Sequence, residues 1–172
     1  MPRLPTPGTP AFEALTTETP AARLRELSLG RVIGYQLAQA SVVADAVFAE
    51  VVQGPDELRM VEFSLLALLL ANGEATPVQI ANALRVSRSY ITNALDRLDR
   101  RQLVQRSAHE TDGRAQKVRL TPQGTAMIQQ STARLLEAEA TAYAPVLTPT
   151  EQLMLGELLH KLARARRPPR PV

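Results

Sequence analysis

Apolar positions in the first third of the chain recur at helical spacing. Between residues 33 and 51 they are separated by four and three positions: Ile33, Leu37, Ala40, Ala44, Val47 and Val51. An α-helix turns once every 3.6 residues, so this spacing forms a seam on one face of a long helix. Gly54-Pro55-Asp56 is predicted to break that helix and restart the next one.

The next segment, Leu58 to Leu70, is apolar on nearly every side, which is typical of a central, buried helix. Asn72-Gly73 is predicted to end it, because a helix end favours a residue that accepts left-handed backbone.

Later helix starts share one local chemistry. Thr76-Pro77-Val78-Gln79 and Thr148-Pro149-Thr150-Glu151 are capping boxes with proline in the first turn. Thr121-Pro122 opens another helix that is predicted to run to about Tyr143. The last helix carries four leucines on one face: Leu155, Leu158, Leu159 and Leu162.

The segment from 76 to 101 predicts a helix-turn-helix, with Arg85-Val86 as the turn and Ser87 capping the second helix. Six apolar residues can form its small core: Ile80, Leu84, Val86, Ile91, Leu95 and Leu98. The outer side of the second helix presents Arg88, Ser89, Thr92, Asn93, Asp96 and Arg97. Short donors and acceptors with arginines are what a helix that reads base edges requires.

A hairpin is predicted after these helices. Residues 103–106 and 116–120 are strand-like, and residues 109–114 turn between them with Asp112-Gly113 at the tip. Arg114 at this tip could lie along a minor groove, whose narrow stretches attract guanidinium groups.

Positive charge is concentrated in the same region. Residues 76–120 hold nine basic and four acidic residues, a net charge of 9 − 4 = +5, whereas the whole chain carries +3. A basic lobe on a faintly acidic body is typical of a module that binds duplex DNA. The aromatic content of 3% disfavours a site built on stacking with unpaired bases.

Composition narrows the remaining possibilities. The chain has no cysteine, which excludes disulfides, thiolate zinc sites and thiol redox sensing. The N-terminus lacks the apolar region of a secretory signal, and the apolar run 63–71 is too short to cross a bilayer, so a cytoplasmic protein without membrane contact is expected. Residues 1–20 are expected to form a disordered tail, and residues 166–172 a basic, proline-rich tail that is solvated rather than bound to DNA.

Residues 30–165 resemble regulators of the multiple-antibiotic-resistance (MarR) family. The resemblance rests on Ile80 to Leu84, Val86-Ser87-Arg88, Ile91-Thr92, Asp96-Arg97-Leu98, Leu103 to Arg106, Asp112-Gly113-Arg114 and Leu120 to Gly124. It implies a mainly α fold with a small β-hairpin wing, a winged helix-turn-helix of about six helices, and a homodimer. Residues 21–55 would form an N-terminal dimerisation helix, 56–121 the DNA-binding lobe and 122–165 the C-terminal dimerisation helices.

The resemblance also implies transcriptional control through a palindromic operator, relieved by a small ligand. The candidates for DNA contact are Thr76, Ser87, Arg88, Ser89, Thr92, Asn93, Arg97, Asp112, Arg114 and Lys117. Arg97 could instead pair with Asp96 or Glu110. The family's ligand region corresponds here to Tyr35, Gln39, Arg59, Phe63, Leu66 and Met127, which would suit an aromatic or lipophilic acid unless these are plain core residues.

Two positions depart from the family pattern, which has glycine where this chain has Arg85 and Gln102. If both keep left-handed backbone, each costs on the order of 1 kcal/mol.

Rival functions remain open. An enzyme is disfavoured because the two histidines, His109 and His160, belong to no catalytic or metal-ligating cluster, and no cofactor motif is visible. An architectural DNA-binding protein without a ligand is the alternative. No visible motif identifies the operator, the effector or the regulated genes, or distinguishes a repressor from an activator.

Overall fold

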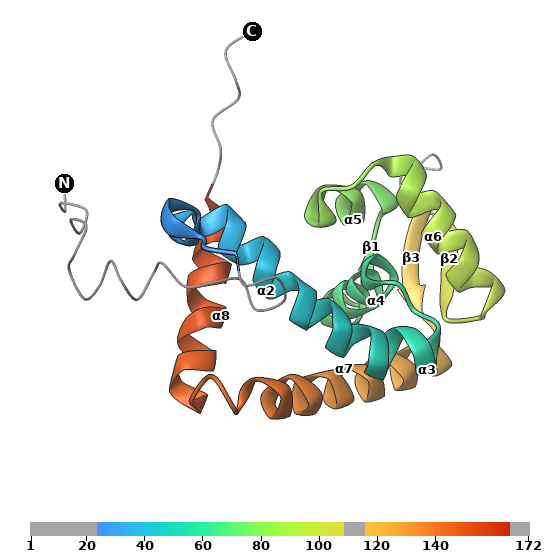
Figure 1. Ribbon diagram of the computed structural model, residues 1–172. Helices are drawn as coiled ribbons and strands as arrows, with labels where there is room; N and C mark the ends of the chain where they lie inside the picture. The colour runs from blue at the N-terminus through green and yellow to red at the C-terminus, as the bar shows by residue number, and fades with distance from the viewer. Residues whose placement is uncertain (1–23, 109–115, 166–172) are drawn as a thin grey trace, which may run out of the picture. The chain divides into compact units, whose positions relative to one another are not determined.

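The computed structural model describes residues 24–108 and 116–165 (Figure 1). The chain forms two compact units, Met1–Ala46 and Val47–Val172. In the first unit a short 3-10 helix, η1 (Leu27–Arg31), precedes α2 (Ile33–Phe48), which continues into the second unit. The side chain of Gln36 donates to the Gly30 carbonyl at 2.8 Å, which closes this turn onto the start of α2.

The first helix does not break at Gly54 as the sequence suggested. A π-helical turn, η2 (Ala49–Gln53), and a last turn, α3 (Gly54–Asp56), extend it. Proline lacks an N–H and crowds the preceding turn, and the wider π turn accommodates it. The chain reverses one residue later, at Glu57, which has left-handed backbone with φ 52°.

Side chains from two other helices hold this corner. Asp56 accepts hydrogen bonds from Ser131 Oγ at 2.5 Å and from the guanidinium of Arg134. Arg101 donates to the carbonyls of Asp56 and Glu57, at 2.7 and 3.1 Å. The two bonds from Arg101 satisfy main-chain carbonyls that the reversal leaves without helical partners.

The central helix is α4 (Met60–Asn72), and it ends as predicted at Gly73, which has positive φ (74°). Its buried leucines join one hydrophobic core with residues from the helices and strands that follow it along the chain. The fully buried side chains include Leu58, Leu65, Leu66, Ile91, Leu98, Leu103 and Ile128. The all-round apolar pattern of α4 is explained by this central position.

The predicted helix-turn-helix is present as α5 (Pro77–Leu84) and α6 (Arg88–Arg100). Thr76 and Ser87 cap the two helices, accepting hydrogen bonds from the main-chain N–H groups of Gln79 and Tyr90. Of the six predicted core residues, Ile80, Ile91, Leu95 and Leu98 are buried, and the other two pack against them at the turn. Arg85 at the turn has left-handed backbone, with φ 55°.

The hairpin strands are β2 (Val104–Ala108) and β3 (Gln116–Leu120). A third strand that the sequence did not suggest, β1 (Glu74–Ala75), pairs with β3, so the antiparallel order is β1-β3-β2. In this register Arg119 of β3 lies opposite Glu74 of β1 on one side and opposite Gln105 of β2 on the other. The residues of the predicted tip, 109–115, lie outside the described part.

Two further helices follow the sheet: α7 (Pro122–Tyr143) and α8 (Pro149–Arg164). Thr148 and Glu151 form the predicted capping box at the start of α8. The start of α7 lies against Leu103, which follows α6, and Thr121 N donates to the Leu103 carbonyl at 3.1 Å. Across residues 24–108 and 116–165, no helix combines the length and apolarity that a bilayer crossing demands.

Candidate nucleic-acid interface

The outward face of α6 is polar and solvent-exposed. Ser89, Asn93 and Arg100 follow at intervals of four and seven residues, so they share a face opposite the buried Ile91, Leu95 and Leu98. Arg88 and Thr92 are also exposed beside this row. We call Arg88, Ser89, Thr92, Asn93 and Arg100 the outer face of α6.

Several hydroxyl groups near this face are already engaged. Ser87 Oγ accepts from Tyr90 N at 3.2 Å and lies 3.1 Å from Ser89 Oγ. Thr92 Oγ1 donates to the Arg88 carbonyl at 3.0 Å. Within the described part of the chain, the Asn93 side chain makes no hydrogen bond, so both its amide donor and its carbonyl acceptor are available for a ligand.

Arg97 points away from the outer face and toward α4. Its Nε donates to Glu62 Oε1 at 2.6 Å, and Glu62 is only 3% exposed. The second oxygen of Glu62 accepts from Arg59 N at 2.8 Å, at the start of α4. Of the two partners suggested for Arg97, Asp96 pairs instead with Arg106, and Glu110 lies outside the described residues. The buried partner lies 35 positions earlier in the sequence, which spacing within one helix does not reveal.

Two basic residues of β3 likewise pair with one carboxylate. Glu74 accepts from the ammonium of Lys117 and from Arg119 Nε at 2.7 Å. The hydrogen bond from Lys117, followed by that from Arg119, holds the pKa of the Glu74 carboxyl below its ordinary value. Glu62 and Glu74 precede the basic region, residues 76–120, in the sequence but pair with its basic side chains. When these two carboxylates are counted with that region, its net charge is 9 − 6 = +3.

The remaining DNA-contact candidates are distributed as follows. Thr76 is half-buried and its hydroxyl is used in the cap of α5, where Oγ1 also contacts Gln79 Oε1 at 3.0 Å. Asp112 and Arg114 lie outside the described residues. The sequence prediction missed Arg100 and Tyr90, which are exposed on α6. Arg100 continues the row of Ser89 and Asn93, a periodic signal that could have identified it.

The six residues predicted to line a ligand site are divided between the two units, and each unit is described by itself. In the first unit, Tyr35 Oη donates to Glu26 Oε1 at 2.9 Å, a bond that raises the pKa of the tyrosine, and Gln39 is exposed. In the second unit, Leu66 is fully buried, and Phe63 packs edge-on against Phe48 with ring centres 5.6 Å apart. Met127 packs against the same core.

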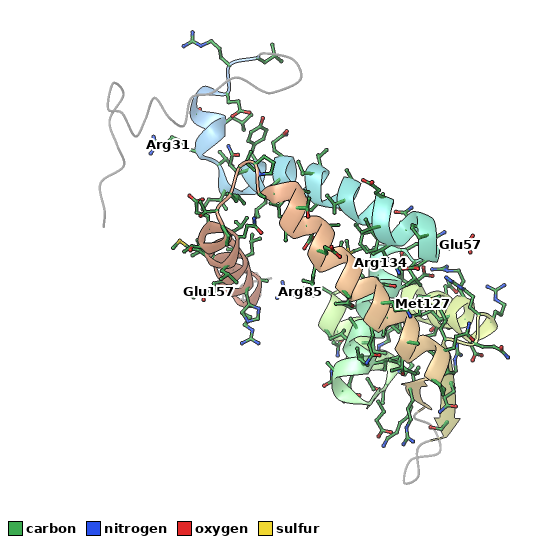
Figure 2. All side chains as sticks on the ribbon, turned by 90° about the horizontal axis from the view of Figure 1, so that it is seen from below. Arg31, Glu57, Arg85, Met127, Arg134 and Glu157 are labelled. Carbon is green, nitrogen blue, oxygen red and sulfur yellow. The ribbon has the colours of Figure 1, made fainter. Side chains whose placement is uncertain are left out.

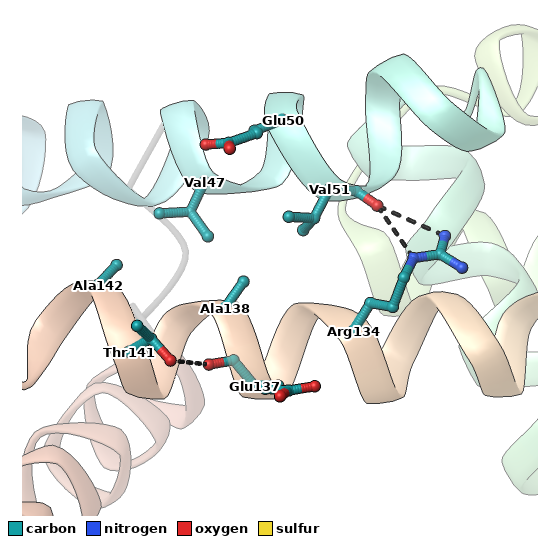
Figure 3. A pocket seen from close by; sticks show the side chains of 8 residues that line it. All are labelled: Val47, Glu50, Val51, Arg134, Glu137, Ala138, Thr141 and Ala142. Atoms are coloured by element: carbon teal, nitrogen blue, oxygen red, sulfur yellow. Dashed lines mark hydrogen bonds between the residues drawn. The ribbon is translucent and has the colours of Figure 1, made fainter.

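Two pockets lie in the second unit. The larger, about 450 Å³, runs between α7 and the end of the first helix (Figure 3). It is lined by Val47, Glu50, Val51, Arg134, Glu137, Ala138, Thr141 and Ala142. The smaller, about 370 Å³, is lined by Glu57, Arg59, Glu62, Arg97, Arg100 and Arg101, and we call it the arginine pocket. Four arginines and two glutamates give it a net charge of 4 − 2 = +2.

An unsatisfied donor marks the arginine pocket. Arg97 Nη2 is buried and has no hydrogen-bond partner among the described residues. A buried N–H without a partner is uncommon in folded proteins and is satisfied when a ligand or water supplies an acceptor. The larger pocket has the opposite charge, because two glutamates accompany one arginine that already pairs with Asp56.

The described elements define a winged-helix protein: a helix-turn-helix followed by an antiparallel hairpin, attached to long helices. Comparison with known proteins supports this class. The sequence profile of the MarR family matches residues 58–115. The transcriptional regulator PecS of Dickeya dadantii is 32% identical over 106 residues, covering 60% of this chain but only 63% of PecS, less than two thirds of its length.

Two solved structures extend the match over longer stretches. The chain is similar to a probable transcriptional regulator from Pseudomonas aeruginosa, with 33% identity, a TM-score of 0.69, and coverage of 78% of this chain and 98% of that one. It is also similar to a cysteine-to-serine variant of MarR from E. coli in complex with operator DNA, with 25% identity, a TM-score of 0.68, and coverage of 79% and 97%. The chain belongs to the MarR family.

Proposed function

We propose that the protein is a transcriptional regulator that binds a palindromic operator in double-stranded DNA as a homodimer. The observation that carries this proposal is the outer face of α6, where Asn93 is unengaged and flanked by exposed arginines. Two nearby arginines pair with carboxylates of the protein instead: Arg97 with Glu62 and Arg106 with Asp96.

The roles within this face follow from side-chain chemistry. An asparagine amide matches the donor and acceptor that adenine presents in the major groove, so Asn93 is assigned to base reading. Arg88 and Arg100, at the two ends of α6, are assigned to backbone phosphates. Ser87 and Thr76 hold the helix starts and contact DNA through their exposed surface. Asp112 and Arg114 keep the wing role that the family resemblance implies.

Dimerisation would present two copies of α6 to successive major grooves, about one helical turn apart. The MarR variant crystallised with operator DNA supports duplex DNA as the partner. Repression, the mode that the family resemblance favours, is the regulatory outcome we propose. Arg97 is assigned to the internal contact with Glu62, and Lys117 to the contact with Glu74, rather than to DNA.

Fluorescence anisotropy with duplexes tests the proposal. The DNA upstream of the protein's own gene and a scrambled duplex are compared over a salt series, with wild type, Asn93→Ala and Arg114→Ala. Loss of a good base contact costs about 1–3 kcal/mol and relaxes selectivity at one position, so Asn93→Ala should bind the upstream duplex more weakly, while its binding to the scrambled duplex should change little. Arg114→Ala should weaken binding to both.

The controls separate the alternatives. Gln129→Ala, an exposed change on α7, should bind like wild type. Equal, weak binding of wild type to both duplexes would instead favour the architectural protein without a ligand, or an operator elsewhere in the genome. Absence of binding at low salt would contradict the proposal as a whole.

We also propose that a small acid acts as effector and that the arginine pocket receives it. The support is the +2 charge of the pocket and the buried, unpartnered Arg97 Nη2. An acid bound there would compete with Glu62 for Arg97 and so bias the position of α6, and a coupling of 1–3 kcal/mol changes DNA affinity about 5- to 150-fold. Benzoate added to the protein–DNA complex at constant ionic strength should lower its anisotropy, whereas uncharged benzyl alcohol should not.

A further inference from the structure

The end of α8 is hydrogen-bonded to the turn of the helix-turn-helix. Arg85 Nη2 donates to the carbonyl of Ala163 at 2.9 Å, and Figure 2 shows Arg85 beside this helix. The last carbonyls of a helix lack partners within the helix and carry partial negative charge, so a guanidinium is a favourable partner there. The bond joins residues that are 78 positions apart in the chain and lie in the same unit.

Arg85 stands at a backbone position that favours glycine. It has left-handed backbone, with φ 55°, at a place where the family pattern has glycine. Glycine reaches this conformation without strain, whereas arginine does not. Glycine would also lack the guanidinium that reaches Ala163. The strained residue is therefore the one that makes the contact with α8.

The position of α8 depends on a small number of contacts. No residue between Pro149 and Arg164 is buried within the chain. At the start of the helix, the side chain of Gln152 donates to the Leu147 carbonyl at 3.1 Å, which ties α8 to the turn before it. At the other end, the bond from Arg85 ties α8 to the turn between α5 and α6. A helix held by few contacts depends strongly on each of them.

The two elements that this bond joins have different proposed roles. α6 would read the operator, and the exposed leucines of α8 lie in the segment predicted to form the dimer. A bond between them restricts the angle at which each lobe leaves the dimer. In a dimer that binds two half-sites, that angle sets the distance between the two copies of α6.

We infer that Arg85 is a positioning residue: by holding α8 to the helix-turn-helix, it selects the half-site separation that the dimer accepts. The inference rests on the proposed DNA binding and adds a determinant of specificity that contacts no base. A chain with glycine at this position would have a lobe that moves more freely on α8, and it would tolerate a wider range of separations.

The first test measures the effect of the bond without DNA. Because the chain has no cysteine, Asn82→Cys on α5 and Glu157→Cys on α8 accept two spin labels at exposed sites. Mixing labelled chains with an excess of unlabelled wild type leaves only the distances within one chain. Double electron–electron resonance should give one narrow distance distribution, which Arg85→Gly should broaden. Arg85→Lys should keep it narrow, because an ammonium can donate to the same carbonyl.

Gln102→Gly is the matched control for this measurement. Gln102 also has left-handed backbone where the family has glycine, with φ 57°. Its carbonyl accepts from Thr121 Oγ1 at 2.6 Å, a main-chain contact that glycine keeps, and among the described residues its side chain makes no hydrogen bond to α8. The distribution in Gln102→Gly should match wild type. An unchanged distribution in Arg85→Gly, or equal broadening in the control, would overturn the inference.

The second test measures the accepted half-site separation. The upstream duplex is compared with versions carrying one or two extra central base pairs, and each added pair moves the half-sites about 3.4 Å apart and rotates them by ~35°. Wild type should bind the altered duplexes at least about tenfold more weakly, and Arg85→Gly should lose most of this discrimination, because a hydrogen bond from a charged group is worth about that factor. Arg85→Lys and Gln102→Gly should discriminate as wild type does.

Two results would contradict this role and leave the proposed function intact. In the first, Arg85→Gly discriminates among the duplexes as wild type does. In the second, it binds all of them more weakly by the same factor, which would mark Arg85 as a phosphate contact instead. Failure of wild type to bind any duplex would overturn both the proposed function and the role of Arg85 in half-site separation.

Discussion

Among the glycines that the structure places, Gly124 leaves the least room for an added side chain. A Cβ built at this position would lie 1.9 Å from the carbonyl oxygen of Leu103. Leu103 is fully buried and its carbonyl also accepts from Thr121 N, so neither side can move without cost. The glycine lets the first turn of α7 rest directly on the backbone that follows α6.

Gly124→Ala should therefore destabilise the protein. Overpacking of this kind typically costs about 1–3 kcal/mol, and the rigid main-chain neighbour places the change at the upper end of that range. Urea unfolding followed by circular dichroism measures it. Gly156→Ala is the matched control, because nothing lies within 4 Å of a Cβ there and alanine favours a helix by about 0.5–1 kcal/mol. Equal stability of the two variants would contradict the close contact at Gly124.

Left-handed residues show how far single positions could be predicted. Arg85 and Gln102, which stand where the family has glycine, both have left-handed backbone, with φ 55° and 57°. Glu57 has the same conformation, with φ 52°, and was not predicted. At Arg85 and Gln102 the comparison with the family pattern marked the position, whereas at Glu57 the nearby Gly54-Pro55 suggested a break three residues too early.

At the scale of elements, helix starts were predictable because their determinants are local. Each capping box lies within four residues, and those at Thr76 and Thr148 form as predicted. The strand β1 was missed because two residues show no periodicity and gain their strand character only from pairing with β3, over forty positions later. The partner of Arg97 was missed for the same reason, since Glu62 belongs to another helix.

The contact of Glu74 with β3 makes this strand pair sensitive to acid. Lys117 and Arg119 lower the pKa of Glu74 in the folded state, which favours its charged form. The carboxylate thus contributes stability above its unfolded pKa, about 4.3, and this contribution is lost as the pH falls through the lower folded value. Glu74→Gln should lower the melting temperature at pH 7, and the difference from wild type should disappear toward pH 3.

A double-mutant cycle supplies the control for this effect. In a background carrying Lys117→Gln and Arg119→Gln, the further change Glu74→Gln should have little effect on the melting temperature at pH 7, because its partners are already removed. A difference between wild type and Glu74→Gln that persists unchanged at pH 3 would show that the carboxylate acts through something other than its charge.

At the scale of the whole molecule, the single chain leaves apolar surface uncovered. On α8 the exposed side chains are Leu153, Met154, Leu155, Leu158, Leu159 and Leu162, with between 39% and 74% of their surface accessible. In the first unit Ile33, Val42 and Val43 of α2 are more than half exposed. Several exposed large apolar side chains on one helix typically mark a protein–protein interface. A second copy of the chain is the partner we propose, since symmetric dimers are the commonest oligomers and a palindromic operator requires one.

Charges placed on the leucine face of α8 should separate the dimer. Leu158 and Leu162 lie one turn apart on this face, and Leu158→Glu with Leu162→Glu should give a monomer in sedimentation equilibrium at micromolar concentration. Because two linked lobes gain about 10²- to 10⁴-fold in avidity over one, operator affinity should fall by a similar factor in anisotropy measurements. Val146→Glu, at a residue 78% exposed between α7 and α8, should remain dimeric and bind as wild type does. A double variant that stays dimeric would place the interface elsewhere. A monomer with undiminished affinity would contradict the proposal that two DNA-binding lobes bind the operator together.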